Sequence, residues 1–439
     1  MTTIRGAGAL WGAAALMSFG VTCAEAQQAA PGSPGPPQRR LERQDDRTVS
    51  AREGENYDPK GVRLGSFLLF PALELNEALN DNVFAQSASS GTTASFLQVI
   101  KPTVELRSTW SSHMLNVYAR GNIGFYTGAP TQNYQDVAVG TDGRIDIQRN
   151  WNIYGGFSFN RKHEDPGLPN TVSGASNVTI YNQLIGSAGY YQKVNRFSTR
   201  AEFTVDNYTY FDNGLGVAQG VVPNADRNRT ELRESLRFGY EFLDGYEFWV
   251  RGSLNQRMYV TPVDATGFAR NSNGWDLVGG ITLDLGGLIT AEAFAGYLQQ
   301  NYVNQGTAPL QGPMFGLLAH WNPLKELWIR PYVRRTVNEA AVIGESGYLN
   351  TSMGFNVSYE VRPNIQLGAL ADYTIADYQS FSSTNSRYDQ YVTFGASVMY
   401  TPVRQFFIGP SYQYVHRASN QPGLDYSQNV IMLRLGARL

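Results

Sequence analysis

An apolar–polar alternation that recurs along most of the sequence is the feature that most constrains this chain. Residues 349–361 carry Leu, Thr, Met, Phe, Val, Tyr and Val at alternate positions, with Asn, Ser, Gly, Asn, Ser and Glu between them. Successive side chains of a strand point to opposite faces, so one face of this strand meets an apolar medium and the other meets water. The pattern recurs at 115–125, 197–206, 365–374 and 431–439, where the chain ends.

Turn signals group the alternating stretches into pairs. We expect tight turns near residues 110–112, 149–150, 194–195, 244–245, 286–287, 322–323, 363–364 and 402–403. Longer segments rich in Gly, Asn, Ser and Pro lie between these turns, for example 87–93, 163–177, 212–226 and 261–273. Short turns alternating with long loops are the signature of a transmembrane β-barrel, with the short turns in the periplasm. We therefore predict an all-β fold for residues 62–439, a transmembrane antiparallel up-and-down β-barrel of about 18 strands (16–18).

The composition agrees with a barrel and disfavours the alternatives. Aromatic residues make up 13% of the chain and charged residues 16%, whereas soluble domains carry about a quarter charged residues. A repeat near 40 residues would also fit the blades of a soluble β-propeller, but blades do not alternate so cleanly over long strands. Amphipathic aromatic rings suit the headgroup layer of a membrane, so we expect many strand-end aromatics to form interfacial girdles. They include Trp110, Trp151, Phe197, Tyr246, Phe248, Trp321, Trp328, Phe406, Phe407, Tyr412 and Tyr414.

The N-terminal residues read as an export signal. Arg5 precedes a short apolar core over 7–21, and Ala24-Glu25-Ala26 is a small-x-small cleavage site, which predicts a signal peptide at 1–26. The alternative is a lipoprotein signal acylated at Cys23, the only cysteine of the chain. Residues 27–61 are rich in proline, glycine and mixed charge, so we expect a disordered Pro-rich periplasmic segment.

The inward faces of the predicted strands carry most of the charged residues. A barrel of this size is wide enough for an aqueous channel. In one interpretation, these charges form ion pairs that brace neighbouring strands of the wall. In the other, arginines, carboxylates and aromatic faces form a track that binds saccharides. The candidate lumen-lining residues are Arg120, Arg144, Arg200, Glu202, Asp206, Arg233, Arg237, Arg251, Arg330, Arg334, Asp372 and Arg434.

No motif in the sequence predicts catalysis, a cofactor or a metal. The four histidines lack metal-ligand spacing, and the nucleophile elbow and nucleotide-binding loops are missing. We expect the polar cluster 163–165 (His-Glu-Asp) to lie in a solvated external loop, and Asn80-Asp81-Asn82 is only a weak calcium signal. Because no catalytic motif is present, we predict a protein that is not an enzyme. The net charge of −2 gives no electrostatic reason to expect nucleic-acid binding.

Three stretches resemble the putative β-barrel porin 2 family of outer-membrane proteins. They are RLGSFLLFPALELNEALNDNVF at 63–84, IKPTVELRSTWSSH at 100–113 and GRIDIQRNW at 143–151. The resemblance extends to the layout of nearly everything after residue 61. It implies an outer-membrane barrel, often associated with exopolysaccharide synthesis and export, and it implies no catalytic residues.

Together the residues and the resemblance predict an integral protein of the cell outer membrane that is exported through a cleaved signal peptide. The first hypothesis is a porin-like channel for export or passage of polysaccharide or saccharide. The alternative is a structural or accessory barrel with a plugged lumen that serves docking or adhesion; an outer-membrane enzyme comes last. The expected partners are outer-membrane lipid and the barrel-assembly machinery, with polysaccharide and periplasmic export proteins as further candidates.

Overall fold

The structure is a computed structural model that describes residues 57–439, except 170, 172–175, 215–220, 265–266, 287, 305, 341–344 and 381–385. The expected signal peptide and residues 27–56 of the expected periplasmic segment lie outside the described residues. In the described residues, three short 3-10 helices, η3 (Ala88–Ser90), η4 (Pro130–Gln132) and η6 (Ala225–Arg227), lie in loops. None of the helices in the described part of the chain is long and apolar enough to cross a membrane.

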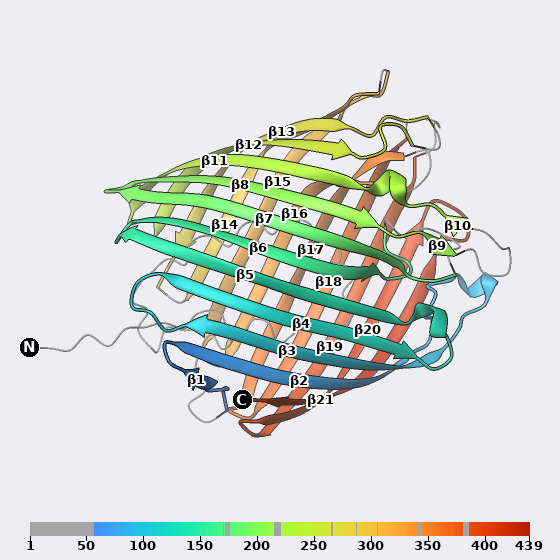
Figure 1. Cartoon of the computed structure of the whole chain (residues 1–439), viewed down its shortest axis with the longest axis horizontal. Helices are drawn as coiled ribbons and strands as arrows, with labels where there is room; N and C mark the ends of the chain where they lie inside the picture. The colour runs from blue at the N-terminus through green and yellow to red at the C-terminus, as the bar shows by residue number, and fades with distance from the viewer. Residues whose placement is uncertain are drawn as a thin grey trace, which may run out of the picture.

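The strands run up and down around one closed barrel (Figure 1). The sheet has 19 strands, of which β1 is a short addition to β2. The strands are β1 (Val62–Leu64), β2 (Phe67–Asn80), β3 (Ser95–Ser108), β4 (Met114–Tyr126), β5 (Tyr134–Gln148), β6 (Trp151–Glu164), β7 (Thr179–Val194), β8 (Phe197–Tyr210), β11 (Arg229–Leu243), β12 (Tyr246–Tyr259), β13 (Ser272–Asp284), β14 (Ile289–Tyr302), β15 (Leu310–Leu324), β16 (Leu327–Glu339), β17 (Glu345–Arg362), β18 (Ile365–Ser380), β19 (Tyr388–Val403), β20 (Phe406–Ser419) and β21 (Tyr426–Arg438). A separate two-stranded ribbon joins β9 (Asn213–Gly214) and β10 (Val221–Val222) in the loop after β8.

The predicted barrel is therefore confirmed, with 18 long strands in the closed wall once β1 is set aside. All pairs are antiparallel, and each strand from β2 to β21 pairs with its neighbour along the chain. The last strand pairs with the first, from Ala72↔Arg438 to Asn80↔Val430, which closes the barrel. Closure joins the two edges that an open sheet would leave free, and this is how a sheet can satisfy its backbone groups inside a bilayer.

The outer face of the barrel is apolar because the alternation predicted from the sequence holds along the strands. On β11, Leu236 and Phe238 are exposed on one face, while Arg233 and Arg237 bind carboxylates on the other. On β2, Leu73 and Leu75 are exposed, whereas Glu74 and Asn76 lie on the opposite face. Two of the expected girdle aromatics lie on the inner face instead: Phe407 is 4% exposed beside Arg438, and Trp328 lies beside His320.

Six of the eight tight turns lie where the sequence predicts them, and two are displaced. The turns expected at 322–323 and 402–403 lie at Lys325–Glu326 and Arg404–Gln405. In both cases the proline that suggested a turn lies in a β-bulge, where the strand register shifts between Trp321 and Leu324 and between Tyr400 and Val403. Proline lacks an N–H donor, so a bulge tolerates it as well as a turn does.

Side-chain contacts reinforce the junction between the first and last strands. Arg434 of β21 donates two hydrogen bonds to Glu74 of β2, at 3.0 and 3.1 Å. Asp81 accepts hydrogen bonds from the backbone and the side chain of Asn429, at 2.7 and 2.6 Å. The Asn-Asp-Asn stretch 80–82 therefore serves this junction, and among the described residues no group of three or more His, Cys, Asp or Glu side chains could hold a metal ion.

We expect Arg434→Met to weaken the junction. The change leaves the carboxylate of Glu74 without its bidentate partner, at a cost of about 1–3 kcal/mol for a partly buried charged hydrogen bond. The temperature at which the folded barrel converts to the unfolded band on an SDS gel should fall. The matched control is Arg107→Met, which removes an equally close pair with Glu105 inside β3; an equal loss in both variants would mean that the junction is not special.

The wall departs from a regular barrel between β15 and β16. Their pairing ends at Gly316↔Arg334 on the side of the long loops, although β16 continues to Glu339 and stays paired with β17. Glu339 has the same parity as Ile329 and Val333, so a regular wall would point it outward. Instead it binds Arg257 and Tyr259, which lie on the inner face of β12. The end of β16 thus lies inside the wall formed by β12–β15.

Candidate functional site in the barrel lumen

Residues 165–169, at the start of the loop between β6 and β7, reach across the lumen, and we call this segment the crossing loop. The carbonyl of Pro169 accepts a hydrogen bond from the Tyr378 hydroxyl of β18 at 2.5 Å. The carbonyl of Gly167 accepts hydrogen bonds from Arg417 of β20 at 3.1 Å and from Tyr391 of β19 at 3.3 Å. The same number of strands separates β7 from β18 in either direction around the barrel, so the loop contacts the opposite wall.

The contact between the crossing loop and the far wall excludes water. Tyr378 is 2% exposed and Tyr391 is 2% exposed, although both side chains are on the inner face of the barrel. An inner face that met open solution would be accessible to water, so these values show a covered wall. Gly167 fits this contact because it has a φ of +86°, and a Cβ there would lie 2.6 Å from the Cβ of Ala85.

The polar cluster 163–165 holds the near end of the crossing loop. His163 lies between Asp136 at 2.9 Å and Asp165 at 3.0 Å, and its ring stacks on Tyr134 with centroids 3.8 Å apart. His163 and Glu164 are both buried. The expectation of a solvated external loop is therefore wrong: the chain turns inward after β6, and buried charges need partners of opposite sign.

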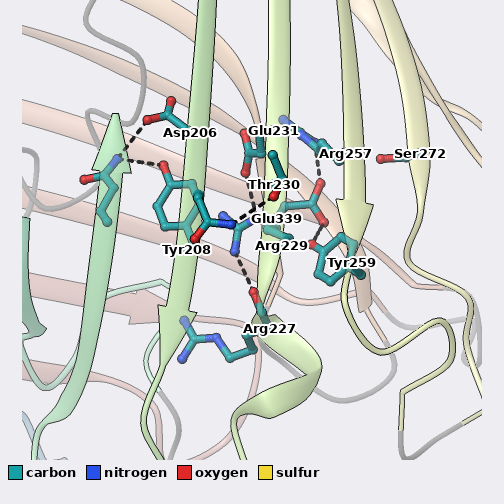
Figure 2. A network of polar contacts seen from close by, with 12 residues as sticks. Asp206, Tyr208, Arg227, Arg229, Thr230, Glu231, Arg257, Tyr259, Ser272 and Glu339 are labelled. Carbon is teal, nitrogen blue, oxygen red and sulfur yellow. Dashed lines mark hydrogen bonds and ion pairs between the residues drawn. The ribbon is translucent and has the colours of Figure 1, made fainter. Parts of the chain in front are cut away.

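A network of ion pairs follows the inner wall from Glu164, at the end of β6, to the end of β16, and Figure 2 shows its part from Arg227 to Glu339. Arg227 of η6 binds both oxygens of Glu164, at 3.0 and 2.5 Å. Burial would lower the pKa of Arg227, but the Glu164 carboxylate outweighs burial and raises it. Arg229 binds Glu231 at 2.6 Å. Each arginine therefore has a carboxylate beside it, as buried charges require.

The network ends on the inward-lying part of β16. Figure 2 shows Glu339 beside Arg257 and Tyr259, and the Tyr259 hydroxyl donates to Glu339 at 2.5 Å. Arg270, in the loop after β12, donates to the carbonyl of Ala340 at 2.6 Å, just beyond the end of β16. Apolar residues fill the remaining space in a buried cluster that comprises Trp249, Phe268, Val278, Leu298, Tyr302, Leu310, Met314 and Leu349.

Five of the twelve residues predicted to line the lumen bind carboxylates on the inner face. Arg144 binds Asp146 at 2.8 Å, Arg233 and Arg251 both bind Asp276, Arg237 binds Glu247 and Glu292, and Arg434 binds Glu74. These pairs come from seven strands rather than from one cluster. The bracing interpretation therefore describes them, although Asp276 binds two arginines and Arg237 binds two carboxylates.

The other seven predicted residues have different surroundings. Arg120 lies over the ring of Tyr118 at 4.6 Å, and Arg200 lies over Tyr191 at 5.8 Å. The carboxylates accept hydrogen bonds: Glu202 from Tyr154, Asp206 from Gln183 and Asp372 from Tyr332. Arg330 has a buried Nε with no hydrogen-bond partner among the described residues, and Arg334 lies at the last pairing of β16 with β15, Gly316↔Arg334.

Sequence reasoning missed the residues that narrow the lumen. Gly167, Pro169, Tyr378, Tyr391 and Glu339 were not candidates, because four are uncharged and Glu339 has outward parity. One available signal was the density of charge in 161–165, directly before Pro166-Gly167. Five charged or titratable residues at the start of a loop can indicate buried partners as well as solvation.

Comparison with known proteins places the chain in a family. The family model described as "Putative beta-barrel porin 2" matches residues 55–439. The chain belongs to this family. It is an outer-membrane β-barrel of the porin-like channel type, and the resemblance noted from its motifs is confirmed. A comparison with curated proteins finds no match.

Three of the solved structures similar to this chain are Pseudomonas aeruginosa proteins with low identity. OpdO has 14% identity and a TM-score of 0.44, covering 84% of this chain and 97% of that one. OpdQ has 10% identity and a TM-score of 0.45, covering 85% and 98%. A structure of OpdK with vanillate has 10% identity and a TM-score of 0.42, covering 84% and 99%. These similarities are too low to indicate a substrate.

Proposed function

We propose that this barrel is a channel for the export or passage of saccharides, including polysaccharide. One observation carries the proposal: aromatic rings and charged groups adjoin one another repeatedly on the inner wall. Arg120 covers one face of Tyr118, and the hydroxyl of Tyr154 binds Glu202 at 2.6 Å. Sugar rings stack on aromatic faces, while guanidinium and carboxylate groups bind sugar hydroxyls.

The position of these groups favours a transit path over a closed binding pocket. Tyr118 is on β4 and Tyr154 is on β6. Both lie in the half of the barrel next to the short turns. The Arg120 side chain is exposed there, whereas the far-wall residues under the crossing loop are covered. The solvated half would therefore meet a saccharide in water, and weak contacts spread over several strands suit passage.

We propose a direct test in planar bilayers with the purified full-length barrel. Neutral linear glucose oligomers added to one side should block the single-channel current reversibly. Tyr118→Ala should weaken this block by roughly tenfold, the size expected when one stacking contact of about 1–1.5 kcal/mol is lost. Tyr359→Ala is the matched control, because Tyr359 is exposed on the outer face of β17.

The alternative is an accessory barrel that conducts only with its export partners, or not at all. The covering of the far wall by the crossing loop favours this alternative. The same measurement separates the two functions. A barrel that is folded by gel mobility yet carries no current, with or without sugars, would contradict the channel and leave the accessory role.

We also propose the route by which the chain reaches the membrane. Residues 1–26 act as a cleaved signal peptide, and 27–61 form a periplasmic segment that leads into the barrel. The barrel-assembly machinery then inserts the strands, and outer-membrane lipid covers the apolar face. Periplasmic export proteins are the proposed partners of the N-terminal segment. Mass spectrometry of the mature protein tests the first step: a start at residue 27 is expected, and an acylated start at Cys23 would contradict it.

A further inference from the structure

Three residues lie in a row on the inner face of β16, in the half of the barrel next to the short turns: Trp328, Arg330 and Tyr332. They occupy alternate positions, so their side chains share one face and follow one another along the strand. All three are half-buried, so water in the lumen reaches part of each. The β17 residues that pair with them are shorter and uncharged: Ser358, Asn356 and Gly354.

The rings of Trp328 and Tyr332 have no arginine over their faces, among the residues that the structure describes. The only ring contact of Trp328 there is with His320, whose ring centre lies 6.0 Å away at a tilt of 35°. Elsewhere on the inner wall an arginine lies 4.1 to 5.8 Å from the ring centres of Tyr118, Tyr191, Trp249, Phe294 and Phe407. A guanidinium group over a ring occupies the face on which a sugar ring would stack. The two rings of β16 therefore offer faces that many other rings of the wall do not.

Arg330, between the two rings, has no carboxylate beside it in the described part of the chain. The bracing arginines Arg107 and Arg434 each direct Nε at a carboxylate oxygen, at 2.8 and 3.0 Å. The Nε of Arg330 and the Nε1 of Trp328 have no hydrogen-bond partner among the described residues. Both nitrogens are covered, so a ligand oxygen would reach them once these half-buried side chains turned toward the lumen. Donors without an acceptor raise the free energy of the empty wall, and a ligand that supplies acceptors recovers it.

Tyr332 is held in place by a carboxylate two strands away. Its hydroxyl donates a hydrogen bond to Asp372 of β18, and the Thr374 hydroxyl donates to the same carboxylate at 2.9 Å. The phenol end of Tyr332 crosses β17 at Gly354, where a Cβ would lie 2.9 Å from the hydroxyl oxygen. A ring that is already fixed loses little conformational entropy when a ligand stacks on it. Asp372 thus acts through Tyr332 and is a positioning residue.

We propose that Trp328, Arg330 and Tyr332 form a binding strip for a linear saccharide chain. The two aromatic rings stack on sugar rings, and Arg330 donates hydrogen bonds to hydroxyl groups between them. Four residues of strand separate the two rings by about 13 Å, so one sugar ring cannot contact both, whereas a linear chain can. The strip runs along the strand and therefore along the path through the wall. This inference rests on the proposed saccharide channel and narrows its substrate to extended chains rather than single sugars.

The experiment measures reversible block of the single-channel current of the full-length barrel by glucose and by linear glucose oligomers of increasing length. In the wild type the blocking concentration should fall as the chain lengthens and level off once the chain spans both rings. Trp328→Ala and Tyr332→Ala should each weaken block by the long oligomers roughly tenfold, the loss of one stacking contact, and flatten the dependence on length. Block by glucose should change much less. Trp328→Phe keeps a ring at the same place and should retain most of the block.

Matched variants separate the strip from general effects on the barrel. Trp321→Ala removes an indole near the same turn, but Trp321 is 41% exposed on the outer face of β15, so block should be unchanged. Arg330→Gln should weaken block by the long oligomers several-fold, whereas Arg107→Gln, whose guanidinium binds Glu105 at 2.8 Å, should not. Asp372→Ala should weaken the same block, and Asp372→Asn, which keeps an acceptor for the Tyr332 hydroxyl, should restore most of it.

The possible outcomes distinguish the strip from the channel. Equal block by glucose and by long oligomers, or equal effects of Trp328→Ala and Trp321→Ala, would overturn the strip. If Tyr118→Ala weakens block while no variant of β16 does, the channel stands and the strip is overturned. No block by any sugar in the wild type would contradict the proposed channel, and the strip with it.

Discussion

Replacing Gly167 by valine is expected to raise the single-channel conductance about twofold or more, because the crossing loop should leave the far wall and widen the path. Gly167 has a φ of +86°, a conformation that costs a β-branched residue about 1–3 kcal/mol. Its Cβ would also lie 2.6 Å from the Cβ of Ala85 and 2.8 Å from the ring of Tyr426. Neither neighbour can move freely, since both belong to the wall or to a loop bonded to it.

Release at Gly167 removes more than one contact. The Gly167 carbonyl accepts the hydrogen bonds from Arg417 and Tyr391, and Pro169, two residues later, accepts from Tyr378. All three donors are on the far wall, so displacement of the backbone by about 1 Å would lengthen these bonds beyond useful geometry. Each neutral bond contributes about 0.5–1.5 kcal/mol and the one from Arg417 about 1.5–3, so their joint loss should free the loop.

Gly423→Val is the matched control for this prediction. Gly423, in the loop between β20 and β21, also has a positive φ, +80°, but a Cβ there would meet nothing within 4 Å. It introduces the same backbone strain without a clash and should leave the conductance unchanged. If Gly167→Val conducts like the wild type while its barrel is folded on an SDS gel, the crossing loop does not limit the path.

The strands of this barrel could be predicted from sequence because each depends on local chemistry. Alternation assigns a face to every residue, and Gly, Asn and Pro between alternating stretches mark the turns. The two displaced turns show the limit of that reasoning. Pro323 and Pro402 look like turn residues, yet both lie in bulges near strand ends, because a proline signals only that a ladder hydrogen bond is missing.

The lumen could be predicted only where the wall is regular. Parity assigned Arg233 and Arg237 to the inner face, and each lies there beside a carboxylate. Parity also assigned Leu349 to an apolar environment, but that environment is the inner wall of β12–β15 rather than lipid. The period of a strand determines which face a side chain is on; it does not determine what covers that face.

The position of the crossing loop could not be predicted from the sequence for a different reason. Its position depends on contacts between residues more than 200 positions apart, such as Tyr378 with Pro169 and Arg417 with Gly167. No local pattern in 165–169 encodes the far wall of a barrel. Such contacts follow only once the strand order and the diameter of the barrel are known.

The second large effect is expected at the end of β16, where Arg257→Met should destabilise the barrel by about 3–5 kcal/mol. That is the usual cost of leaving one charge of a buried ion pair without its partner. Glu339 is 7% exposed, and among the described residues it would retain only the hydrogen bond from Tyr259, in a region packed with apolar side chains. The midpoint of urea unfolding in lipid vesicles, followed by tryptophan fluorescence, measures the loss.

The double variant Arg257→Met with Glu339→Leu tests the cause. Replacing both charges by apolar residues of similar size removes the unpaired carboxylate, so most of the lost stability should return, as it does for other buried pairs. Arg257 also lies near Glu231. In Arg257→Met, Glu231 would still have its ion pair with Arg229 at 2.6 Å. A double variant as unstable as Arg257→Met would show that Arg257 acts through packing or through Glu231. Recovery would show that Arg257 stabilises the barrel mainly by compensating the Glu339 carboxylate, which is buried because the end of β16 lies inside the wall.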